Sequence, residues 1–327
     1  MQWTRDIRAA GRGLRTAIRA ASAIAKAQMR TPQPRPGWAI VPTPDLLKQP
    51  TRSGIAEWRG FGSNPGHLAM LVYTPPEPPL PGTPLIVVLH GCGQSATDFA
   101  AQAGWVALAD RLRVPLVLPE QSDDNNRGRC FNWFRPVHIE RDLGEAQSIQ
   151  QMVGTAVRQF DADPERVFVT GLSAGGAMTA ALLAADPDVF AAGAVVAGLP
   201  VGAATGAAQA LARMAQAGPE RSAKAWGDVV RDAAPTNYSG LWPRISIWRG
   251  MADVTVDPAN GELLATQWSD VHGLDTRRST ITSLPTATRE TWGSAEQPAV
   301  ELWTLPGIGH VWPDQATRQI ATFWGLD

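Results

Sequence analysis

Cysteines are scarce in this sequence and long apolar runs are missing, and each absence excludes a class of protein. The two cysteines, Cys92 and Cys130, are too few for a disulfide scaffold, so a large buried core must stabilise the fold. No apolar run is long enough to span a membrane, and the N-terminus lacks the apolar stretch of a secretory signal.

Motifs for metal ions, nucleotides and nucleic acids are also missing. The sequence has no His-Glu-x-x-His, no paired Cys-x-x-Cys and no glycine-rich phosphate loop, and Asp123-Asp124 lacks the rest of a calcium-binding loop. The net charge of −1 gives no overall attraction to nucleic acid. We therefore expect no metal, no cofactor and no nucleic-acid partner.

Charge is unevenly distributed along the 327 residues. Residues 1–37 carry eight basic side chains against one acid, a local charge of +7, which leaves −8 for the remainder. Arginines spaced by three or four in this segment would share one face of a helix. We predict a solvated basic helix followed by a proline-rich linker, with contact of residues 1–30 to an anionic surface or polymer granule as the alternative. Residues 38–327 are predicted to form one domain, since 44% of the chain is hydrophobic and 18% is charged.

Short apolar strands alternate with helical segments from about residue 85 to 200. The run Leu85–Leu89 is typical of a strand buried on both faces of a parallel sheet, and helical periodicity follows over Thr97–Leu112. This alternation predicts an α/β fold with a mostly parallel central sheet flanked by helices. The alanine-rich residues 201–240 interrupt the alternation before the strand at Ile245–Trp248, and we predict that they form a small helical cap.

The motif Gly171-Leu172-Ser173-Ala174-Gly175 matches Gly-x-Ser-x-Gly between a predicted strand and a predicted helix. That context places the serine on a tight, strained turn with its hydroxyl exposed above the sheet. Small neighbours are needed because other backbone segments approach the turn closely. We therefore predict that Ser173 is a nucleophile.

A serine nucleophile needs a base and an acid that orients the base. His310 follows the late strand Val300–Leu305, which is the position of the base in this fold, whereas His272 ends a predicted helix. Asp253 follows Ile245–Trp248 and is the preferred acid. Asp257 is the rival, but the Pro258 behind it favours a helix cap.

Two backbone N–H groups are needed to stabilise the oxyanion that such a nucleophile creates. The first should belong to Ala174, directly after the serine. The second should come from His90-Gly91-Cys92-Gly93, which follows the first buried strand, and Cys92 is the predicted donor.

Several longer motifs add a family resemblance. From about His67 to Trp312 the sequence resembles the polyhydroxybutyrate (PHB) depolymerase-type esterases, α/β-hydrolases close to feruloyl and acetylxylan esterases. Besides the serine motif, the matching segments are Leu89–Ala96, Cys130–Phe134, Gly144–Ile149 and Gly309–Pro313. The Cys-Phe-Asn-Trp-Phe run is the most specific of these, because the general hydrolase fold does not require it.

The resemblance implies a Ser173–Asp253–His310 triad and an oxyanion hole formed by Cys92 and Ala174. It also implies a disulfide between Cys92 and Cys130 and an apolar wall that binds the ester, formed by Trp133 and Trp312. One position departs from the family pattern, because Arg249 stands in the acid loop where histidine is usual.

These features predict a serine carboxylic-ester hydrolase that cleaves short-chain hydroxyalkanoate esters, as oligomer or polymer, through an acyl-enzyme. A feruloyl or acetylxylan esterase is the alternative within the family. The alternative of another class is a granule- or surface-binding protein with little hydrolysis. Many members of the family are secreted and no signal sequence is visible here, so an extracellular and a cytoplasmic location both stay open.

Overall fold

The computed structural model describes residues 53–326 of the chain. The predicted basic helix and linker, residues 1–37, lie outside this range. Within residues 53–326, no helix combines the length and the apolarity needed to cross a membrane.

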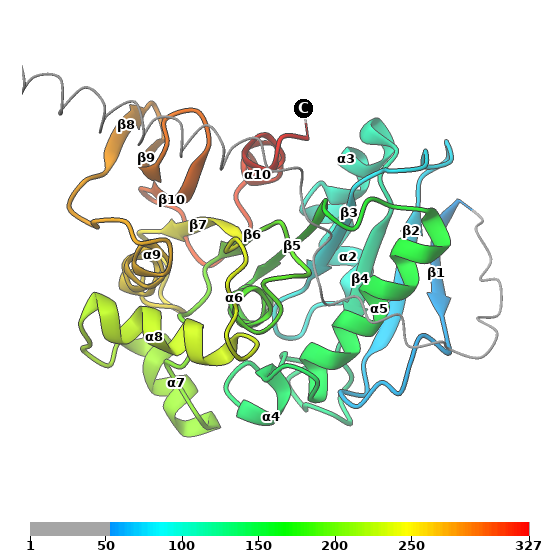
Figure 1. Cartoon of the computed structure of the whole chain (residues 1–327), viewed down its shortest axis with the longest axis horizontal. Coiled ribbons are helices and arrows are strands. Elements are labelled where there is room, and N and C mark those ends of the chain that lie inside the picture. The colour runs from blue at the N-terminus through cyan, green and yellow to red at the C-terminus, as the bar shows by residue number, and fades with distance from the viewer. Residues whose placement is uncertain (1–52, 327) are drawn as a thin grey trace, which may run out of the picture. The chain divides into compact units, whose positions relative to one another are not determined.

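One ten-stranded sheet runs through the described residues, and its central strands are parallel (Figure 1). The strands, in sheet order, are β1 (Gly54–Trp58), β2 (Ala69–Thr74), β4 (Leu116–Glu120), β3 (Leu85–Leu89), β5 (Val167–Leu172), β6 (Ala192–Val196), β7 (Arg244–Gly250), β10 (Pro298–Leu305), β9 (Ala287–Gly293) and β8 (Thr280–Leu284). From β4 to β10 each pair of neighbours is parallel, and antiparallel strands extend both edges. The parallel centre was predicted from the alternation of strands and helices.

Helices cover both faces of the sheet (Figure 1). They are α2 (Ala96–Gln102), α3 (Trp105–Leu112), α4 (Pro136–Ile139), α5 (Gly144–Phe160), α6 (Ala174–Ala185), α7 (Ala207–Ala215), α8 (Ala223–Ala233), α9 (Ala259–Val271) and α10 (Ala316–Trp324). On one face α2, α3 and α10 pack over a core that includes Phe99, Trp105 and Trp324. On the other face α5, α6 and α9 lie against the strands, and α8 packs on α9. Because both faces are covered, all residues of β3, β5 and β6 are buried.

The structure corrects the sequence-based assignment of elements in two places. The helix predicted over Thr97–Leu112 is two helices, because Gly104 adopts a left-handed conformation (φ 79°) between α2 and α3. The strands at the two edges of the sheet, β1 on one side and β8 and β9 on the other, were not predicted. Every residue of β8 is exposed, so that strand has no buried face to produce an apolar alternation in the sequence.

Candidate active site

The loops that follow the parallel strands all emerge at one edge of the sheet. Ser173 directly follows β5, while Asp253 and His310 lie on the loops after β7 and β10. Four loops form this edge: the oxyanion loop after β3 (residues 90–94), the pocket loop after β4 (121–135), the acid loop after β7 (251–258) and the histidine loop after β10 (306–313). The topology therefore brings all the predicted site residues to the same edge.

Ser173 occupies the sharp turn between β5 and α6. Its backbone has φ 59° and ψ −118°, outside the regions that ordinary residues adopt, and its N–H donates to the carbonyl of Val196 at 2.9 Å. A Cβ on Gly171 would lie 2.4 Å from the carbonyl of Gly175, and a Cβ on Gly175 would lie 2.4 Å from the Leu89 carbonyl oxygen. The two motif glycines therefore let the turn close and press it against the end of β3.

Asp253 and His310 are joined by a hydrogen bond. His310 Nδ1 lies 2.7 Å from Asp253 Oδ2, and the carboxylate is almost fully buried. The other oxygen, Oδ1, accepts the N–H groups of Thr255 and Val256 at 2.8 and 2.9 Å. These bonds fix the carboxylate so that it orients the imidazole, leaving Nε2 to act as a base. No hydrogen bond from the Ser173 hydroxyl to His310 occurs in the structure of residues 53–326.

The acid and histidine loops are bonded to each other along their backbones. Ala252 N–H donates to the carbonyl of Ile308 at 2.9 Å, and Met251 N–H donates to that of Leu305 at 3.0 Å. A Cβ on Gly250 would lie 2.2 Å from the Ile308 carbonyl oxygen, so the two backbones are in direct contact. The pairing of Asp253 with His310 therefore rests on main-chain geometry as well as on the side chains.

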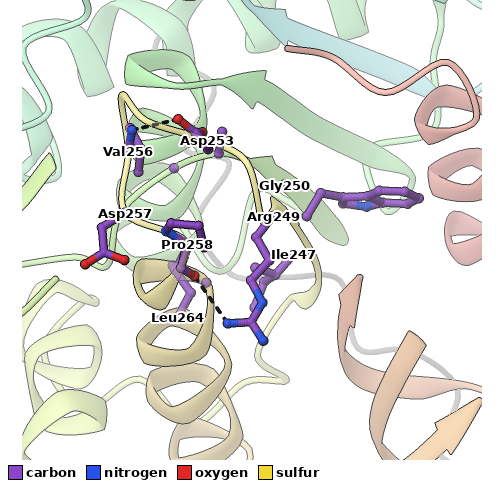
Figure 2. A pocket seen from close by; sticks show the side chains of 12 residues that line it. Ile247, Arg249, Gly250, Asp253, Val256, Asp257, Pro258 and Leu264 are labelled. Atoms are coloured by element: carbon purple, nitrogen blue, oxygen red, sulfur yellow. Dashed lines mark hydrogen bonds between the residues drawn. The ribbon is translucent and has the colours of Figure 1, made fainter. Parts of the chain in front are cut away.

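Asp257, the rival acid, bonds backbone groups and makes no bond to His310. Its Oδ1 accepts Ala259 N–H at 3.0 Å at the start of α9, and Oδ2 accepts Ala217 N–H at 2.9 Å beyond the cap helix α7. In Figure 2 the carboxylates of Asp253 and Asp257 lie on different sides of the acid loop. Asp257 therefore caps α9 and ties α7 to the acid loop.

Arg249, the departure from the family pattern, holds the base of the acid loop. Its guanidinium donates to Thr304 Oγ1 at 2.9 Å and to Glu262 Oε1 at 2.6 Å. It also donates to the Pro258 carbonyl at 3.4 Å (Figure 2). Arginine thus connects β7, β10 and α9, and the acid loop has a defined shape without a histidine at this position.

Both residues predicted to donate to the oxyanion, Cys92 and Ala174, line the same pocket as Ser173. Ala174 begins α6, where first-turn N–H groups have no intrahelical partner, and the oxyanion loop packs on the same turn through Gly91. Within residues 53–326, neither Ala174 N–H nor Cys92 N–H donates to another protein group. Cys92 and Cys130 form a disulfide, which attaches the oxyanion loop to the pocket loop.

His90 anchors the start of the oxyanion loop. The ring is fully buried, and Nε2 accepts the N–H of Gln121 at 3.1 Å. Nδ1 therefore carries the hydrogen and donates to the Gly91 carbonyl at 2.7 Å. Burial lowers the pKa of His90 to about 4, so the ring is neutral at neutral pH. It is a structural histidine that holds the loop.

A buried carboxylate that the sequence analysis did not assign holds the pocket loop. Glu145, in the first turn of α5, accepts hydrogen bonds from Gln121 Nε2 at 2.7 Å, from Asn125 Nδ2 at 3.1 Å, and from Asn132 N and Nδ2 at 2.8 and 2.6 Å. Glu145 and Asn132 belong to two of the segments that carry the family resemblance. The presence of both residues in these segments is the only sequence signal that could have suggested their hydrogen bonds.

A pocket of about 670 Å³ opens beside Ser173. The pocket loop forms a polar wall with its residues 123–127 and an aromatic wall with Trp133 and Phe134. The cap helix α7 and Leu199 supply an apolar wall. The residues on that side are Leu199, Ala207, Ala210, Leu211 and Met214. Such a mixed cavity suits an ester with an apolar chain and polar groups.

The two predicted substrate-binding tryptophans lie in different environments. Trp133 is buried at 6% exposure, lines the pocket with Ser173 and packs edge-on against Phe134. Trp312 packs against Phe99 and Trp105, and its N–H donates to Thr317 Oγ1 at 3.0 Å. Trp312 is absent from the pocket's lining among the described residues; its ring is half-buried and packs against the core between α2 and α3.

Comparisons with known proteins agree with the motifs. The family profile described as Esterase PHB depolymerase matches residues 68–290. The chain is 40% identical to poly(3-hydroxyalkanoate) depolymerase C of Paucimonas lemoignei over 260 residues, which are 79% of this chain and 62% of that protein. It is 36% identical to an acetylxylan esterase of Coprinopsis cinerea over 281 residues, 83% of this chain and 73% of the relative. The chain thus spans less than two thirds of the length of the depolymerase.

Solved structures show the same fold. The acetyl xylan esterase from Aspergillus awamori superposes with a TM-score of 0.76 at 23% identity, covering 84% of this chain and 100% of that one. A poly(3-hydroxybutyrate) depolymerase from Bordetella parapertussis superposes with a TM-score of 0.52 at 20% identity, covering 84% and 90%. The predicted α/β-hydrolase fold is confirmed.

Proposed function

The chain belongs to the PHB depolymerase esterase family, and on this premise we propose that it is a serine carboxylic-ester hydrolase that works through an acyl-enzyme. The observation that carries the proposal is the hydrogen-bonded pair of Asp253 and His310 at the sheet edge where the strained Ser173 turn emerges. A strained serine turn alone fits many proteins of this fold. A buried carboxylate that orients an imidazole is the second part that acyl transfer requires.

In the first half of the proposed reaction, Ser173 Oγ attacks the ester carbonyl and His310 Nε2 takes its proton. The N–H groups of Ala174 and Cys92 stabilise the resulting oxyanion. His310 then gives the proton to the leaving alcohol as the carbon–oxygen bond breaks, which leaves the acyl group on Ser173. In the second half a water molecule gives its proton to His310 and attacks the acyl-enzyme, and the acid leaves as Ser173 recovers its proton.

For the substrate we propose short-chain hydroxyalkanoate esters of the PHB type, as oligomer or polymer. The 40% identity to a poly(3-hydroxyalkanoate) depolymerase supports this choice. The pocket beside Ser173 supports it as well, because apolar side chains of the cap helix and polar side chains of residues 123–127 both line it. A feruloyl or acetylxylan ester is the second candidate, favoured by the 36% identity to an acetylxylan esterase and by Trp133, whose aromatic ring lines the pocket.

The test is a substrate panel with the wild-type chain and Ser173→Ala. We expect hydrolysis of hydroxybutyrate oligomers at a higher kcat/KM than methyl ferulate or acetylated xylan, and loss of all three activities in Ser173→Ala. Cleavage of the ferulate alone would show that the substrate assignment is wrong. Hydrolysis of p-nitrophenyl butyrate that survives Ser173→Ala would refute the mechanism.

For the basic segment, residues 1–30, we propose contact with an anionic surface or a polymer granule, supported by its local excess of arginine. Deletion of residues 1–37 should lower binding to granules or anionic vesicles and leave kcat on a soluble ester unchanged. Equal binding by both forms would refute this role.

A further inference from the structure

Glu145 lies at the centre of a polar cluster that has no part in the proposed chemistry. Its side chain is completely buried, and all four of its hydrogen bonds come from the pocket loop, through Gln121, Asn125 and Asn132. Every partner is an N–H group. A carboxylate presents acceptors only, whereas an amide or a protonated carboxyl group would turn a donor toward these N–H groups. These hydrogen bonds therefore favour the ionised carboxylate, whereas burial favours the protonated form and raises the pKa of Glu145 to about 7.

Among residues 53–326, the basic side chain within 4 Å of this carboxylate is His138 on α4. Its Nδ1 lies 3.6 Å from Glu145 Oε1, beyond a hydrogen bond. Burial and the nearby Arg135 and His67 lower the pKa of His138, so its ring is neutral near pH 7. Amide dipoles, rather than a cation, therefore compensate the charge of Glu145.

The pocket loop that Glu145 holds makes three separate connections to the oxyanion loop. Gln121 N–H bonds the ring of His90, Gly128 accepts the N–H of Gly93 at 2.9 Å, and Cys130 forms the disulfide with Cys92. Asn132, bonded to Glu145 through backbone and side chain, directly precedes Trp133 in the pocket wall. A shift of the pocket loop would therefore move both a donor to the oxyanion and a wall of the pocket.

We propose that Glu145 is a positioning residue for ester hydrolysis: by fixing the pocket loop it sets the place of the Cys92 N–H group and of the Trp133 wall. This inference rests on the proposed function, because it assumes that Ser173 forms the acyl-enzyme. It assigns Glu145 no contact with the substrate. Its effect on the reaction passes through Gln121, Asn132 and the disulfide.

The test compares Glu145→Gln with Asp186→Asn, a matched loss of a buried carboxylate. Asp186 is 1% exposed at the end of α6, and it contacts Arg141 and Gln150, outside the pocket loop. Burial raises the pKa of both carboxyl groups to about 7, so both substitutions disturb a similar buried group. Reactive serines are counted by exhaustive titration with a fluorophosphonate, and kcat and KM on p-nitrophenyl butyrate are expressed per titrated site.

We expect Glu145→Gln to lower kcat per titrated site by about tenfold or more, since loss of one oxyanion donor costs 10²–10³, and to raise KM. Asp186→Asn should change both values by less than about twofold, and Glu145→Asp, which keeps the carboxylate, should recover part of the loss. Asn132→Ala removes the side-chain donor to Glu145 and should also lower kcat and raise KM. This variant takes the place of Glu145→Gln in the test if Glu145→Gln does not fold. Wild-type kcat and KM per site in Glu145→Gln, or in Asn132→Ala in its place, would overturn the proposal. Failure of the proposed function is seen separately, as activity that survives Ser173→Ala.

Discussion

Asp253 and Asp257 stand four residues apart on the acid loop, yet only Asp253 bonds His310, at 2.7 Å, while Asp257 bonds the backbone of α9 and of the segment after α7. Asp253→Asn should keep the bonds to Thr255 and Val256 through its amide oxygen and turn its NH₂ group toward His310. The imidazole would then carry its hydrogen on Nε2 and could not accept the serine proton. We expect kcat to fall by about 10³–10⁴.

Asp257→Asn should act mainly on binding. It weakens the bond to Ala217 and so loosens α7, which lines the pocket, while His310 keeps its partner. We expect KM to rise by about two- to fivefold with kcat nearly unchanged. Steady-state kinetics of both variants on p-nitrophenyl butyrate would check this difference, and a larger fall of kcat in Asp257→Asn than in Asp253→Asn would contradict the assignment of the acid.

The disulfide should contribute to stability and to catalysis. It closes a loop with a sequence separation of 38, for which the chain-entropy relation gives a stabilisation of about 4 kcal/mol. The double variant Cys92→Ala/Cys130→Ala keeps the backbone N–H at position 92 but releases the oxyanion loop from the pocket loop. We expect a lower free energy of unfolding in urea and a lower kcat. An unchanged kcat would show that the remaining contacts of His90 and Gly93 are enough to place the loop.

The two tryptophans should respond differently to truncation. Trp133→Ala removes part of the pocket wall, so KM for butyrate esters should rise by about tenfold, with a smaller effect on stability than Trp312→Ala. Trp312→Ala leaves a cavity between Phe99 and Trp105 and should lower the free energy of unfolding by about 3 kcal/mol. A large rise of KM in Trp312→Ala, measured on the folded variant, would restore the role in binding that the sequence analysis predicted for it.

Among the buried groups with a shifted pKa, Glu145 and His90 change stability with pH in opposite directions. Burial raises the pKa of Glu145 from 4.5 to about 7, so its contribution to stability is complete below pH 4.5 and is lost as the pH rises toward 7. Burial lowers the pKa of His90 from 6.5 to about 4, so its contribution is complete above pH 6.5 and is lost as the pH falls toward 4. Between pH 4.5 and 6.5 a rise in pH therefore lowers the stability that Glu145 contributes and raises the stability that His90 contributes.

Glu145→Gln removes the pH dependence of stability that comes from Glu145 and leaves the one that comes from His90. On acidification from about pH 6.5 to 4.5, the variant should lose stability more steeply than the wild type, by roughly 1.4 kcal/mol per pH unit. Urea unfolding of both proteins across this range measures the difference. Parallel curves would mean that Glu145 has the same proton affinity in the folded and unfolded chains.

Local chain geometry and chain order account for what could be predicted from the sequence. The Gly-x-Ser-x-Gly motif by itself predicts the tight serine turn, because Gly171 and Gly175 have no room for a Cβ beside neighbouring backbone. The continuous apolar run of β3 indicated a sheet covered on both faces, and the pairing of Asp253 with His310 agrees with the chain order that this fold imposes. These features lie in a short stretch of chain or in the order of the elements.

Other features depend on which distant residues meet, and they become visible only in the folded chain. Trp312 and Trp133 are chemically the same and both stand near site motifs, but the ring of Trp312 packs against the core beside Trp105 and that of Trp133 lines the pocket. Glu145 gives no signal of its role in the sequence, because its partners lie 13 to 24 residues away on another segment. Packing and hydrogen bonding between separate segments are cooperative, so the local sequence determined the serine turn and the class of fold, while the folded chain determined which side chains support that turn.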